Sequence, residues 1–390
     1  MISSPHSLSG TRDVRILSGN DPSDYPSRRI AVAMSGGVDS SLAAVLLKEA
    51  GFDVVGLTMV LWDYDRCGGG HTRGCCDLST VNDAREVAEA AGIPHYTVNL
   101  REEFDLIVVE NFVNNYLCGY TPNPCVICNT AIKWDALLKK ARSIGCDLIA
   151  TGHYARIGSY TDGTFTLLTG IDPSKDQSYF LWGLCSSELA FTLFPLGALT
   201  KTETRAEAAR RNLHTANRSE SQEICFITDN DYGRFLIHRL GDRIPLALTP
   251  GDILDISGKI IGRHRGAAFY TVGQRRGLGV ALGYPAYVVR VDAAANTITI
   301  GSREDILSPS MFVVKPSWLR GFPPAEIFSC KVRIRYRHQG VPAVVEMAPK
   351  GLNVVFKTPQ SAVTPGQSAV FYDDEVVLGG GIIQSNDLQN

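Results

Sequence analysis

The sequence predicts an α/β protein with an N-terminal, doubly wound parallel sheet of Rossmann-like type, a small central domain and a C-terminal β-barrel. Short β-rich runs alternate with amphipathic helical runs from Arg29 onward. The helical periodicity fades after about residue 235, and short turn-bounded strands follow from about residue 287. Because 390 residues exceed what one hydrophobic core usually supports, we expect domains at 29–235, 236–286 and 287–390.

Composition limits the classes of function. Apolar residues make up 44% of the chain and charged residues 20%, which is typical of a soluble globular protein. The net charge of -2 means that any nucleic acid must be held by local basic patches. No apolar run reaches the roughly 18 residues that a membrane helix needs, so we expect no membrane association.

The N-terminal segment and the cysteines indicate a compartment. Residues 1–28 lack the apolar core of a secretory signal, and we interpret them as a polar extension. A disordered conformation is one interpretation of this extension. Ten cysteines without an export signal are expected to be reduced thiols, metal ligands or catalytic groups. The cytoplasm is therefore the expected location.

The first predicted unit is strand, helix, strand. Ile30 to Ala33 forms the first strand, Ser41 to Ala50 a helix that Gly51 closes, and Val54 to Val60 the second strand. Such a unit places two parallel strands side by side with the helix across one face.

The alternation then continues to about residue 156. We expect helices around 81–91 and 104–112, a strand at 96–98, a cysteine-bearing loop at 121–130, a helix at 132–144 and a strand at 147–150. The last strand ends in the string TGHYAR. Open α/β sheets bind ligands at such strand ends, so this edge is the predicted site.

A glycine-rich run joins the first strand to the first helix, where backbone N–H groups and the helix dipole favour an anion. The run reads Ala33-Met34-Ser35-Gly36-Gly37-Val38-Asp39-Ser40-Ser41. A glycine turn followed by an ordinary helix N-cap is the simpler interpretation of its core. The run lacks the lysine of a Walker A loop and the spacing of a dinucleotide loop, which disfavours P-loop kinases and dehydrogenases.

Two further strings carry cysteines. Cys125 and Cys128 form a C-x-x-C in TPNPCVICN, and Cys225 lies in SQEICFI. A structural zinc site is one reading of C-x-x-C, but no second pair follows at finger-like spacing. For Cys225 alone, a buried apolar cysteine is the simpler reading, since Ile224 and Phe226 flank it.

These strings together resemble a known family. SGGVDS resembles the PP-loop of the ATP pyrophosphatase superfamily, and the whole chain resembles the tRNA-specific 2-thiouridylases over about residues 29 to 385. The strings that carry the resemblance are SGGVDSS, TPNPCVICN, ATGHYAR, KDQSYFL, SQEICFI, FYTVGQRRGLG and TPGQ.

The resemblance implies a nucleotide site for ATP with Mg²⁺. Met59 would lie near the adenine, and Gly152 would complete the site. The implied phosphate-binding residues are Ala33, Met34, Ser35, Gly36, Gly37, Val38, Asp39 and Ser40.

The resemblance also implies the chemistry. The C2 oxygen of the wobble uridine is adenylated, Cys225 carries a persulfide that a cysteine desulfurase relay supplies, and Cys128 assists and forms a disulfide with Cys225. We expect a monomer that grips the anticodon stem-loop of tRNA.

Cys125 departs from the family pattern, because many members have aspartate at this position. Cys125, Cys128 and Cys225 are the ligand set that a three-cysteine [4Fe–4S] cluster would need, so persulfide and cluster mechanisms both stay open. The roles of Cys67, Cys75 and Cys76 are not assigned by any motif.

Several residues are expected to contact tRNA. A stripe of four cations alternates along the predicted strand 330–337, and a second basic group surrounds Phe269 and Tyr270. The cations are Lys331, Arg333, Arg335 and Arg337 in the stripe, and Arg263, His264, Arg265, Arg275 and Arg276 around the aromatic pair. The contacts that the resemblance implies are Asn123, Pro124, Cys125, His153, Lys175, Asp176, Gln177, Arg335, Tyr336 and Gln367.

Two other functions remain as alternatives. One is a small-molecule amidotransferase or ligase of the same superfamily, which the paired cysteine strings and the absence of a glutaminase domain disfavour. The other is a sulfur carrier or RNA-binding protein without catalytic activity, which the intact SGGVDS and cysteine strings disfavour.

Overall fold

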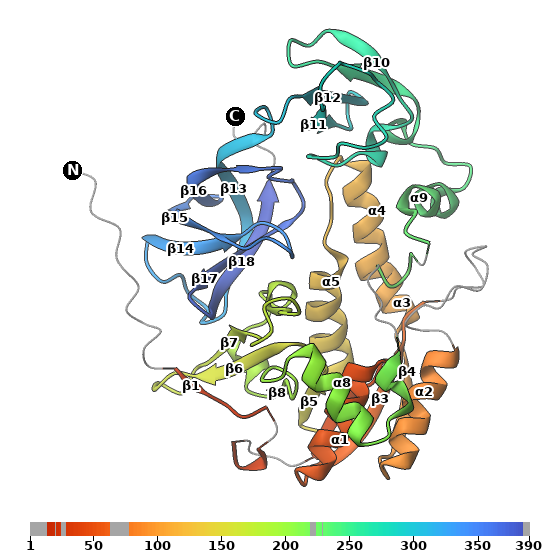
Figure 1. The fold of residues 1–390 in the computed structure, drawn as a ribbon, viewed down its shortest axis with the longest axis vertical. Helices are drawn as coiled ribbons and strands as arrows, with labels where there is room; N and C mark the ends of the chain where they lie inside the picture. Colours follow the sequence, from red (N-terminus) through yellow and green to blue (C-terminus); the bar gives the residue numbers. More distant parts are fainter. Residues whose placement is uncertain are drawn as a thin grey trace.

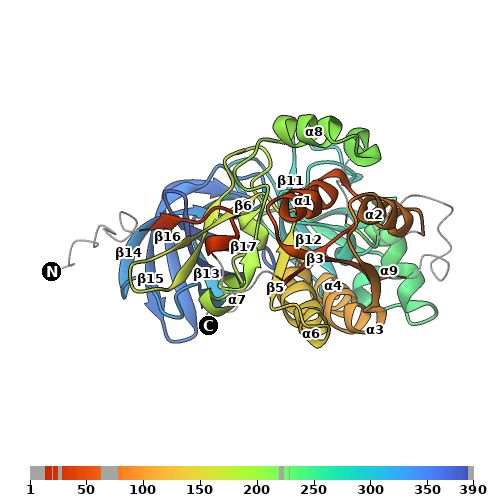
Figure 2. The same cartoon turned by 90° about the horizontal axis from the view of Figure 1, so that it is seen from below.

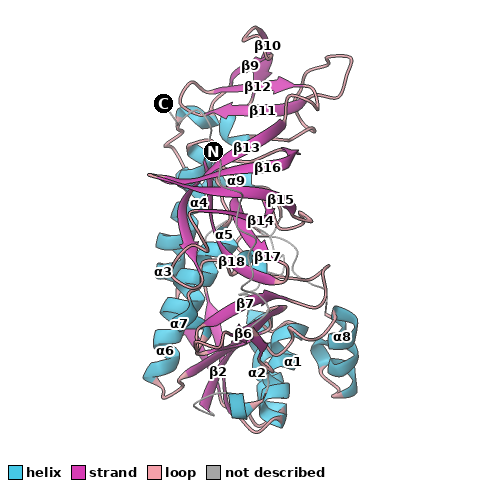
Figure 3. Ribbon diagram, turned by 90° about the vertical axis from the view of Figure 1, so that its left-hand side faces the viewer, coloured by secondary structure: helices cyan, strands magenta, loops and turns pink. Residues whose placement is uncertain are grey.

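The computed structural model describes residues 14–19, 21–24, 29–62, 78–218, 224–227 and 229–384. Three bodies follow one another along the long axis of the molecule: a parallel sheet with helices, a β-barrel and a small sheet (Figures 1 and 3). Residues Cys67, Cys75 and Cys76, and the SQE of SQEICFI, lie outside the described residues.

The first body contains a five-stranded parallel sheet of order β4-β3-β2-β5-β8. The predicted strands are all present, each within about two residues of its expected bounds. The strands are β2 (Arg29–Ala33), β3 (Asp53–Val60), β4 (His95–Asn99), β5 (Leu148–Thr151) and β8 (Thr192–Leu193). Their apolar residues face both ways, as expected of a sheet that is covered on both sides.

Helices cover the two faces of this sheet (Figure 2). One face packs on α1 (Val38–Glu49) and α2 (Leu78–Ala90) through residues such as Val32 and Leu47. The other face packs through Ala31 and Leu57 on the consecutive helices from α3 to α6. These are α3 (Arg101–Phe104), the π-helical η3 (Asp105–Val109), α4 (Glu110–Leu117), α5 (Pro124–Ile127), the π-helical η4 (Cys128–Leu137) and α6 (Leu138–Ser143).

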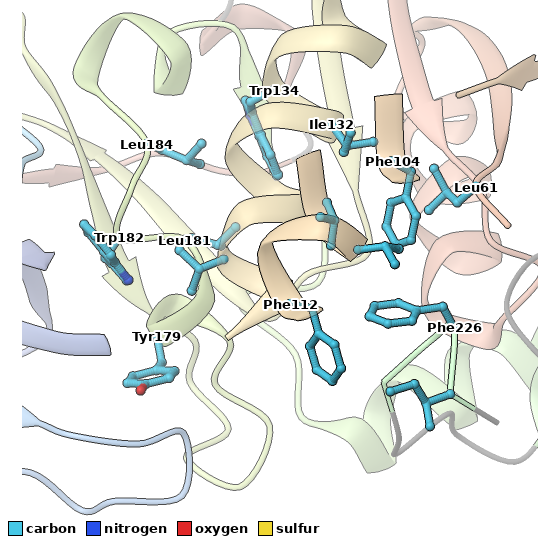
Figure 4. Close-up of a cluster of buried hydrophobic side chains, with 14 of the residues drawn as sticks. Leu61, Phe104, Phe112, Ile132, Trp134, Tyr179, Leu181, Trp182, Leu184 and Phe226 are labelled. Atoms are coloured by element: carbon cyan, nitrogen blue, oxygen red, sulfur yellow. The ribbon is translucent and has the colours of Figure 1, made fainter. Parts of the chain in front are cut away.

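The cysteine motif lies on helix, not on the loop that we expected at 121–130. α5, η4 and α6 run without interruption from Pro124 to Ser143. Pro124 occupies the first helical position, where its missing N–H costs nothing and its fixed φ favours helix. Cys125 and Cys128 therefore lie in the first turns of a helix that reaches into the core through Ile132 and Trp134 (Figure 4).

Two strands after the parallel sheet were missed by the sequence analysis. β6 (Ala155–Ser159) and β7 (Phe165–Thr169) form a hairpin that extends the sheet of the barrel, since β7 pairs with β18 (Val376–Gln384). β1 (Arg15–Ile16) pairs with β6, so part of the segment that we expected to be a polar extension is a strand. Leu17 is buried there, which explains the order.

The remaining described helices are short and lie in the connections between strands. α8 begins with a complete capping box, in which Thr200 accepts from the Glu203 N–H and the Glu203 carboxylate accepts from the Thr200 N–H. The helices are η1 (Pro22–Asp24), η5 (Ser178–Phe180), α7 (Ser186–Leu189), α8 (Lys201–Arg210), η6 (His214–Asn217), α9 (Tyr232–Leu240), η7 (Leu246–Leu248) and η8 (Ala267–Phe269).

The barrel is closed and antiparallel. Its strand order is β18-β13-β16-β15-β14-β17, and β17 pairs back with β18. The other strands are β13 (Leu307–Trp318), β14 (Ile327–Arg333), β15 (Val341–Ala348), β16 (Gly351–Ser361) and β17 (Ser368–Asp373). Closure removes the exposed sheet edges that promote aggregation.

The small sheet has the order β10-β9-β12-β11. It contains β9 (Gly251–Leu254), β10 (Ile260–His264), β11 (Tyr287–Asp292) and β12 (Thr297–Gly301). β11 and β12, which the sequence analysis assigned to the barrel, belong to this sheet because β12 pairs in parallel with β9. None of the helices in the described ranges is long and apolar enough to cross a membrane.

Candidate functional site

The SGGVDS run folds into a loop at the carboxyl edge of the parallel sheet. Met34 continues β2, with its N–H donating to the Leu57 carbonyl at 2.8 Å and its carbonyl accepting from Thr58 Oγ1 at 2.7 Å. Ser40 Oγ then accepts from the Ser35 N–H at 3.0 Å, which folds the loop back over the first turn of α1. The backbone of residues 35–37 is thereby held above a helix N-terminus, as an anion site requires.

Two glycines make this loop possible. Gly36 has φ +71°, and a Cβ there would lie 2.2 Å from the Thr80 carbonyl oxygen of α2. Gly152 follows β5, and a Cβ there would lie 2.8 Å from the Asp39 carbonyl carbon and from the Ser40 nitrogen. Both positions accept only glycine, so the structure brings together the phosphate loop and the Gly152 that the resemblance assigned to the same site.

Met59 lies at the same edge of the sheet, near the end of β3, where it is half-buried against the core. Ligands of open α/β sheets bind at this edge. Met59 therefore lies at the edge where a nucleotide would bind, and its contact with the adenine stays a prediction.

Lys201 supplies a cation that the loop itself lacks. Its Nζ donates to both oxygens of Asp39, at 2.7 and 2.8 Å, and the Tyr154 hydroxyl donates to Asp39 Oδ1 at 2.8 Å. The side chain of Lys201 is only 11% exposed, so the pair is weakly screened. Sequence reasoning missed this lysine because it is remote in the chain and belongs to no quoted string.

Arg218 is a second residue that sequence reasoning missed. Its Nη1 donates to the Gly36 carbonyl at 2.9 Å, and it pairs with Asp83 of α2. Arg205 of α8 holds this segment by donating to the carbonyls of Ala216 and Arg218. The loop is thus surrounded by cations from two later segments.

These residues fit ATP. The cradle offers N–H groups, a helix N-terminus and glycine positions that a Cβ would fill, which together suit a triphosphate. Asp39 does not fit as a direct ligand of Mg²⁺, because the Lys201 ammonium already bonds to both of its carboxylate oxygens and the Tyr154 hydroxyl to one of them.

Cys125 and Cys128 are supported by the helical segment that runs from α3 to α4. α5 contacts η3, and η4 contacts α3. Cys125 is exposed and Cys128 is half-buried. The side chain of Val126, between them, is buried in the core and fixes the rotation of the helix.

Cys225 rests on the same helical segment. The neighbouring Phe226 packs edge-to-face on Phe104 and Phe112, with ring centroids 5.7 and 5.2 Å apart, and lies 5.3 Å from Phe235 of α9 (Figure 4). Cys225 itself is half-buried. The flanking apolar residues therefore anchor the cysteine at the edge of the core instead of burying it.

The three cysteines do not form a preformed site for a single metal ion. Among the described residues, the one group of three or more candidate ligands with atoms within 4.8 Å of one another is Asp83, Glu86 and His214. An iron–sulfur cluster spaces its thiolates more widely, because each binds a different iron.

The barrel reaches the cysteine helix through aromatic residues. The Tyr336 ring lies 4.6 Å from that of Phe180, and the Phe180 carbonyl accepts from Asn129 Nδ2 at 2.9 Å. Gln367 Nε2 donates to the carbonyls of Thr121 and Pro122. Gln367 thus bonds to the segment that leads into the cysteine motif, and Tyr336 lies against Phe180, which holds Asn129 of the same helix.

His153 is buried, with 9% of its surface exposed. Its Nδ1 lies 2.6 Å from Thr151 Oγ1, and its Nε2 lies 3.3 Å from the Nζ of Lys133. An ammonium only donates, so Nε2 accepts and Nδ1 carries the proton. Burial and the positive charge of Lys133 hold the pKa of His153 well below its usual value, so the ring is neutral at pH 7.

The Lys175-Asp176-Gln177 turn is mainly structural. Asp176 is buried and accepts from the N–H groups of Gly170 and Ser178 and from Arg333. Gln177 Oε1 accepts from the Tyr154 N–H at 3.0 Å. Lys175 is half-buried.

The predicted basic stripe is wrong. β14 ends at Arg333, so residues 334–337 form a turn instead of continuing the strand. Arg333 points inward, where its Nη1 donates to Asp176 Oδ2 and its guanidinium lies 4.5 Å from the Tyr372 ring centroid. Lys331, Arg335 and Arg337 remain exposed.

The aromatic pair of the central body is also unavailable for stacking on bases. Phe269 and Tyr270 are each 5% exposed, and His264 is buried beside them. Among the cations around them, Arg263, Arg265, Arg275 and Arg276 are exposed. The exposed cations therefore lie here without the predicted aromatic pair, and the exposed aromatic ring of this region is that of Tyr284.

Comparison with known proteins agrees with this architecture. Three family models match: a tRNA methyl transferase HUP domain at residues 28–229, a tRNA methyl transferase PRC-barrel domain at 238–302 and an aminomethyltransferase β-barrel domain at 308–383. The tRNA-specific 2-thiouridylase MnmA of Geotalea uraniireducens (strain Rf4) is 50% identical over 92% of this chain and 95% of its own. The chain belongs to the tRNA-specific 2-thiouridylase family.

Other members of the 2-thiouridylase family are similar. The MnmA proteins of Geobacter metallireducens (strain ATCC 53774 / DSM 7210 / GS-15) and Salinibacter ruber (strain DSM 13855 / M31) are 48% and 49% identical, over 92% and 91% of this chain and 97% and 94% of theirs. Among solved structures, the U34-tRNA thiolase NcsA from Methanococcus maripaludis with its [4Fe–4S] cluster is 18% identical with a TM-score of 0.34, over 56% of this chain and 65% of that one.

Proposed function

We propose that the chain uses ATP to activate C2 of the wobble uridine in tRNA and replaces its oxygen with sulfur carried by cysteine. The observation that carries the proposal is that a member of this family contains both a phosphate-binding loop and a pair of cysteine segments. A phosphate cradle lies at the carboxyl edge of the sheet, and two cysteine segments rest on one helical segment, which runs from α3 to α4.

Activation is the first step. The C2 oxygen of the uracil attacks the α-phosphate of ATP, the bond between the α- and β-phosphates breaks, and pyrophosphate leaves. The N–H groups at residues 35–37 and the N-terminus of α1 stabilise the charge on the phosphates. We propose Ala33 to Ser40, Met59 and Gly152 as the nucleotide site, with Mg²⁺ arriving on the phosphate oxygens of ATP.

Sulfur transfer is the second step. The outer sulfur of a Cys225 persulfide attacks C2, and AMP leaves with the former C2 oxygen. The Cys128 thiolate then attacks the inner sulfur, which releases 2-thiouridine and leaves a disulfide between Cys128 and Cys225. A dithiol reductant restores both thiols, and a persulfide donor from a cysteine desulfurase relay reloads Cys225.

Cys125 keeps an alternative open. With Cys128 and Cys225, it would hold a [4Fe–4S] cluster, which would supply an iron with an open position for sulfide. We favour the persulfide scheme, because it needs only the two cysteines of the family strings.

The tRNA surface is proposed from the position of each side chain. Asn123, Pro124 and Cys125 lie at the start of the cysteine helix, and the side chains of Lys175, Arg335 and Tyr336 are exposed or half-buried. His153, Asp176 and Gln177 would contribute to tRNA binding indirectly, by hydrogen bonds that fix the backbone and side chains around them. We further propose a cytoplasmic monomer that binds the anticodon stem-loop.

Cysteine variants test the proposal. Cys225→Ser should release pyrophosphate from ATP in the presence of tRNA but form no 2-thiouridine above the level without enzyme, because activation precedes sulfur transfer. Cys128→Ser should stop before release of product. Cys118→Ser is the matched control, since Cys118 is exposed but belongs to no functional string, and it should thiolate at the normal rate.

Normal thiolation by Cys225→Ser would show that another group carries the sulfur. Loss of both thiolation and pyrophosphate release in every variant, including Cys118→Ser, would point to misfolding and would require a check by thermal denaturation.

A further inference from the structure

The segment Thr121-Pro122-Asn123 leads into the cysteine helix and depends on hydrogen bonds from other parts of the molecule for its position. Pro122 and Pro124 lack N–H groups, so no regular backbone ladder can form through them. The carbonyls of Thr121 and Pro122 are the acceptors that need outside donors. Their donors come from the barrel, which is remote in sequence.

The turn that carries the string TPGQ, residues 364–367, provides these partners. Gln367 Nε2 donates to the Thr121 carbonyl at 3.0 Å and to the Pro122 carbonyl at 3.3 Å. In return, the Thr121 N–H donates to the Pro365 carbonyl at 2.8 Å. Both polar backbone groups of Thr121 are therefore bonded to the barrel.

Gly366 allows the close approach. Its φ is +91°, and a Cβ there would lie 2.9 Å from the nitrogen and from the oxygen of Thr121. The turn is itself fixed to the last strand of the barrel, because the Gly366 N–H donates to the Ile383 carbonyl and the Ile383 N–H donates to the Gln367 carbonyl.

Two further ties act in the same direction. The Thr121 hydroxyl bonds to the Thr271 hydroxyl of the central body at 3.1 Å. Tyr179 donates its hydroxyl to the Ser368 carbonyl at 2.9 Å and also bonds to the side chain of Asn123. All three bodies of the molecule thus meet on this short segment.

We propose that Gln367 is a positioning residue for the cysteine helix: it fixes the segment before Pro124 and so sets the place of Cys125 and Cys128 before tRNA binds. The inference rests on the proposed function, since it assigns Cys128 a part in sulfur transfer. This positioning role differs from a direct contact between Gln367 and tRNA, because Gln367 would hold the cysteine helix in place even when no tRNA is bound.

The test compares Gln367→Ala with Arg335→Ala. Arg335 is exposed, and its described hydrogen bond runs to the Ser361 carbonyl and not to the cysteine segment. Three quantities are measured: the rate of iodoacetamide alkylation of Cys128 without tRNA, by mass spectrometry; the Kd for an anticodon stem-loop; and kcat for thiolation.

For Gln367→Ala we expect alkylation of Cys128 to rise about fivefold, the factor that corresponds to one lost hydrogen bond. The value of kcat should fall, while the Kd for the stem-loop should stay within about twofold of the wild-type value, which is less than the loss of one hydrogen bond would give. For Arg335→Ala we expect the reverse: weaker binding of the stem-loop and normal alkylation.

Gln367→Glu is a second, nearly isosteric variant that removes the donor, and it should repeat the result of Gln367→Ala. Wild-type alkylation rates in both Gln367 variants, with weaker binding of the stem-loop, would overturn the proposal and make Gln367 a tRNA contact. Because alkylation needs neither ATP nor tRNA, a wild-type protein without thiolase activity would refute the proposed function but leave this comparison intact.

Discussion

Asp39 is an acidic residue inside a loop that is built to bind phosphate, and Lys201 makes this compatible. The ammonium lies within 2.8 Å of both carboxylate oxygens, so the triphosphate meets a neutral pair and not an unpaired anion. The sequence predicted the loop and Asp39 but not Lys201, because spacing in a chain does not reveal a pair that is 162 residues apart.

The pair is tested by a double-mutant cycle. Lys201→Met should lower kcat/KM for ATP by about a hundredfold, because an uncompensated Asp39 repels the phosphates and displaces the loop. Adding Asp39→Asn to Lys201→Met should recover about tenfold or more of that loss. Strictly additive effects of the two substitutions would show that the ion pair has no part in ATP use.

His153 predicts a pH dependence of stability. Its pKa in the folded protein is held well below 6.5, whereas the unfolded chain takes up the proton near 6.5. The unfolded state therefore binds more protons below pH 6.5, and the free energy of unfolding falls there with a limiting slope of about 1.4 kcal/mol per pH unit. The loss continues until the pH reaches the folded-state pKa.

His153→Gln should flatten this slope between about pH 6.5 and 5, the window below the ordinary histidine pKa. The exposed His238 is the control, and His238→Gln should leave the slope unchanged. Urea denaturation at several pH values measures it. An unaltered slope in His153→Gln would contradict the buried, neutral state of the ring.

At the scale of elements, glycine decides where the phosphate loop can approach its neighbours. Gly36→Ala should abolish measurable ATP binding, because the left-handed φ and the 2.2 Å approach to Thr80 force the loop out of place. Gly51→Ala is the matched control: Gly51 has φ +95° but nothing within 4 Å of a Cβ.

Gly51→Ala should cost about 1 kcal/mol of stability through backbone strain and leave ATP affinity unchanged. Isothermal titration with a nonhydrolysable ATP analogue separates the two variants. Equal ATP affinities for Gly36→Ala and the wild type would show that the close approach at Gly36 is not needed for the site.

Element types were predictable where hydrophobic periodicity was strong, as in the parallel strands and in α1 and α2. The cysteine motif was expected on a loop because its two prolines suggest irregular structure, yet Pro124 begins a helix. The predicted strand at 330–337 is too long, because the alternation of charged and apolar residues continues past Arg333 in the sequence. In the structure the strand ends at Arg333, whose side chain turns inward to Asp176.

At the scale of the whole molecule, one buried ion pair joins the barrel to the first body. The side chains of Arg333 and Asp176 are 17% and 2% exposed. Arg333→Met should lower the free energy of unfolding by about 3 kcal/mol, because it leaves the Asp176 charge buried without its partner. Arg337→Met, at an exposed position of the following turn, should change it by less than about 0.5 kcal/mol.

Chemical denaturation followed by tryptophan fluorescence measures both variants. Equal stability of Arg333→Met and Arg337→Met would show that the barrel docks without this pair.

The order of the three bodies along the chain was predicted from the sequence, but their junctions were not. β11 and β12 look like barrel strands by pattern, and only their pairing with β9 assigns them to the small sheet. The hairpin β6–β7 follows directly on β5, and its partner strand β18 lies at the other end of the chain. Pairing between distant segments leaves no periodic signal in either one.

The most direct test of sulfur transfer by cysteine is thiolation of unmodified tRNA by protein that is purified without oxygen and then freed of iron by a chelator. With ATP and a persulfide donor, the iron-free protein should form 2-thiouridine, and Cys225→Ser should not. If activity instead requires about four irons per chain and disappears with them, Cys125, Cys128 and Cys225 hold a cluster and the persulfide scheme is contradicted.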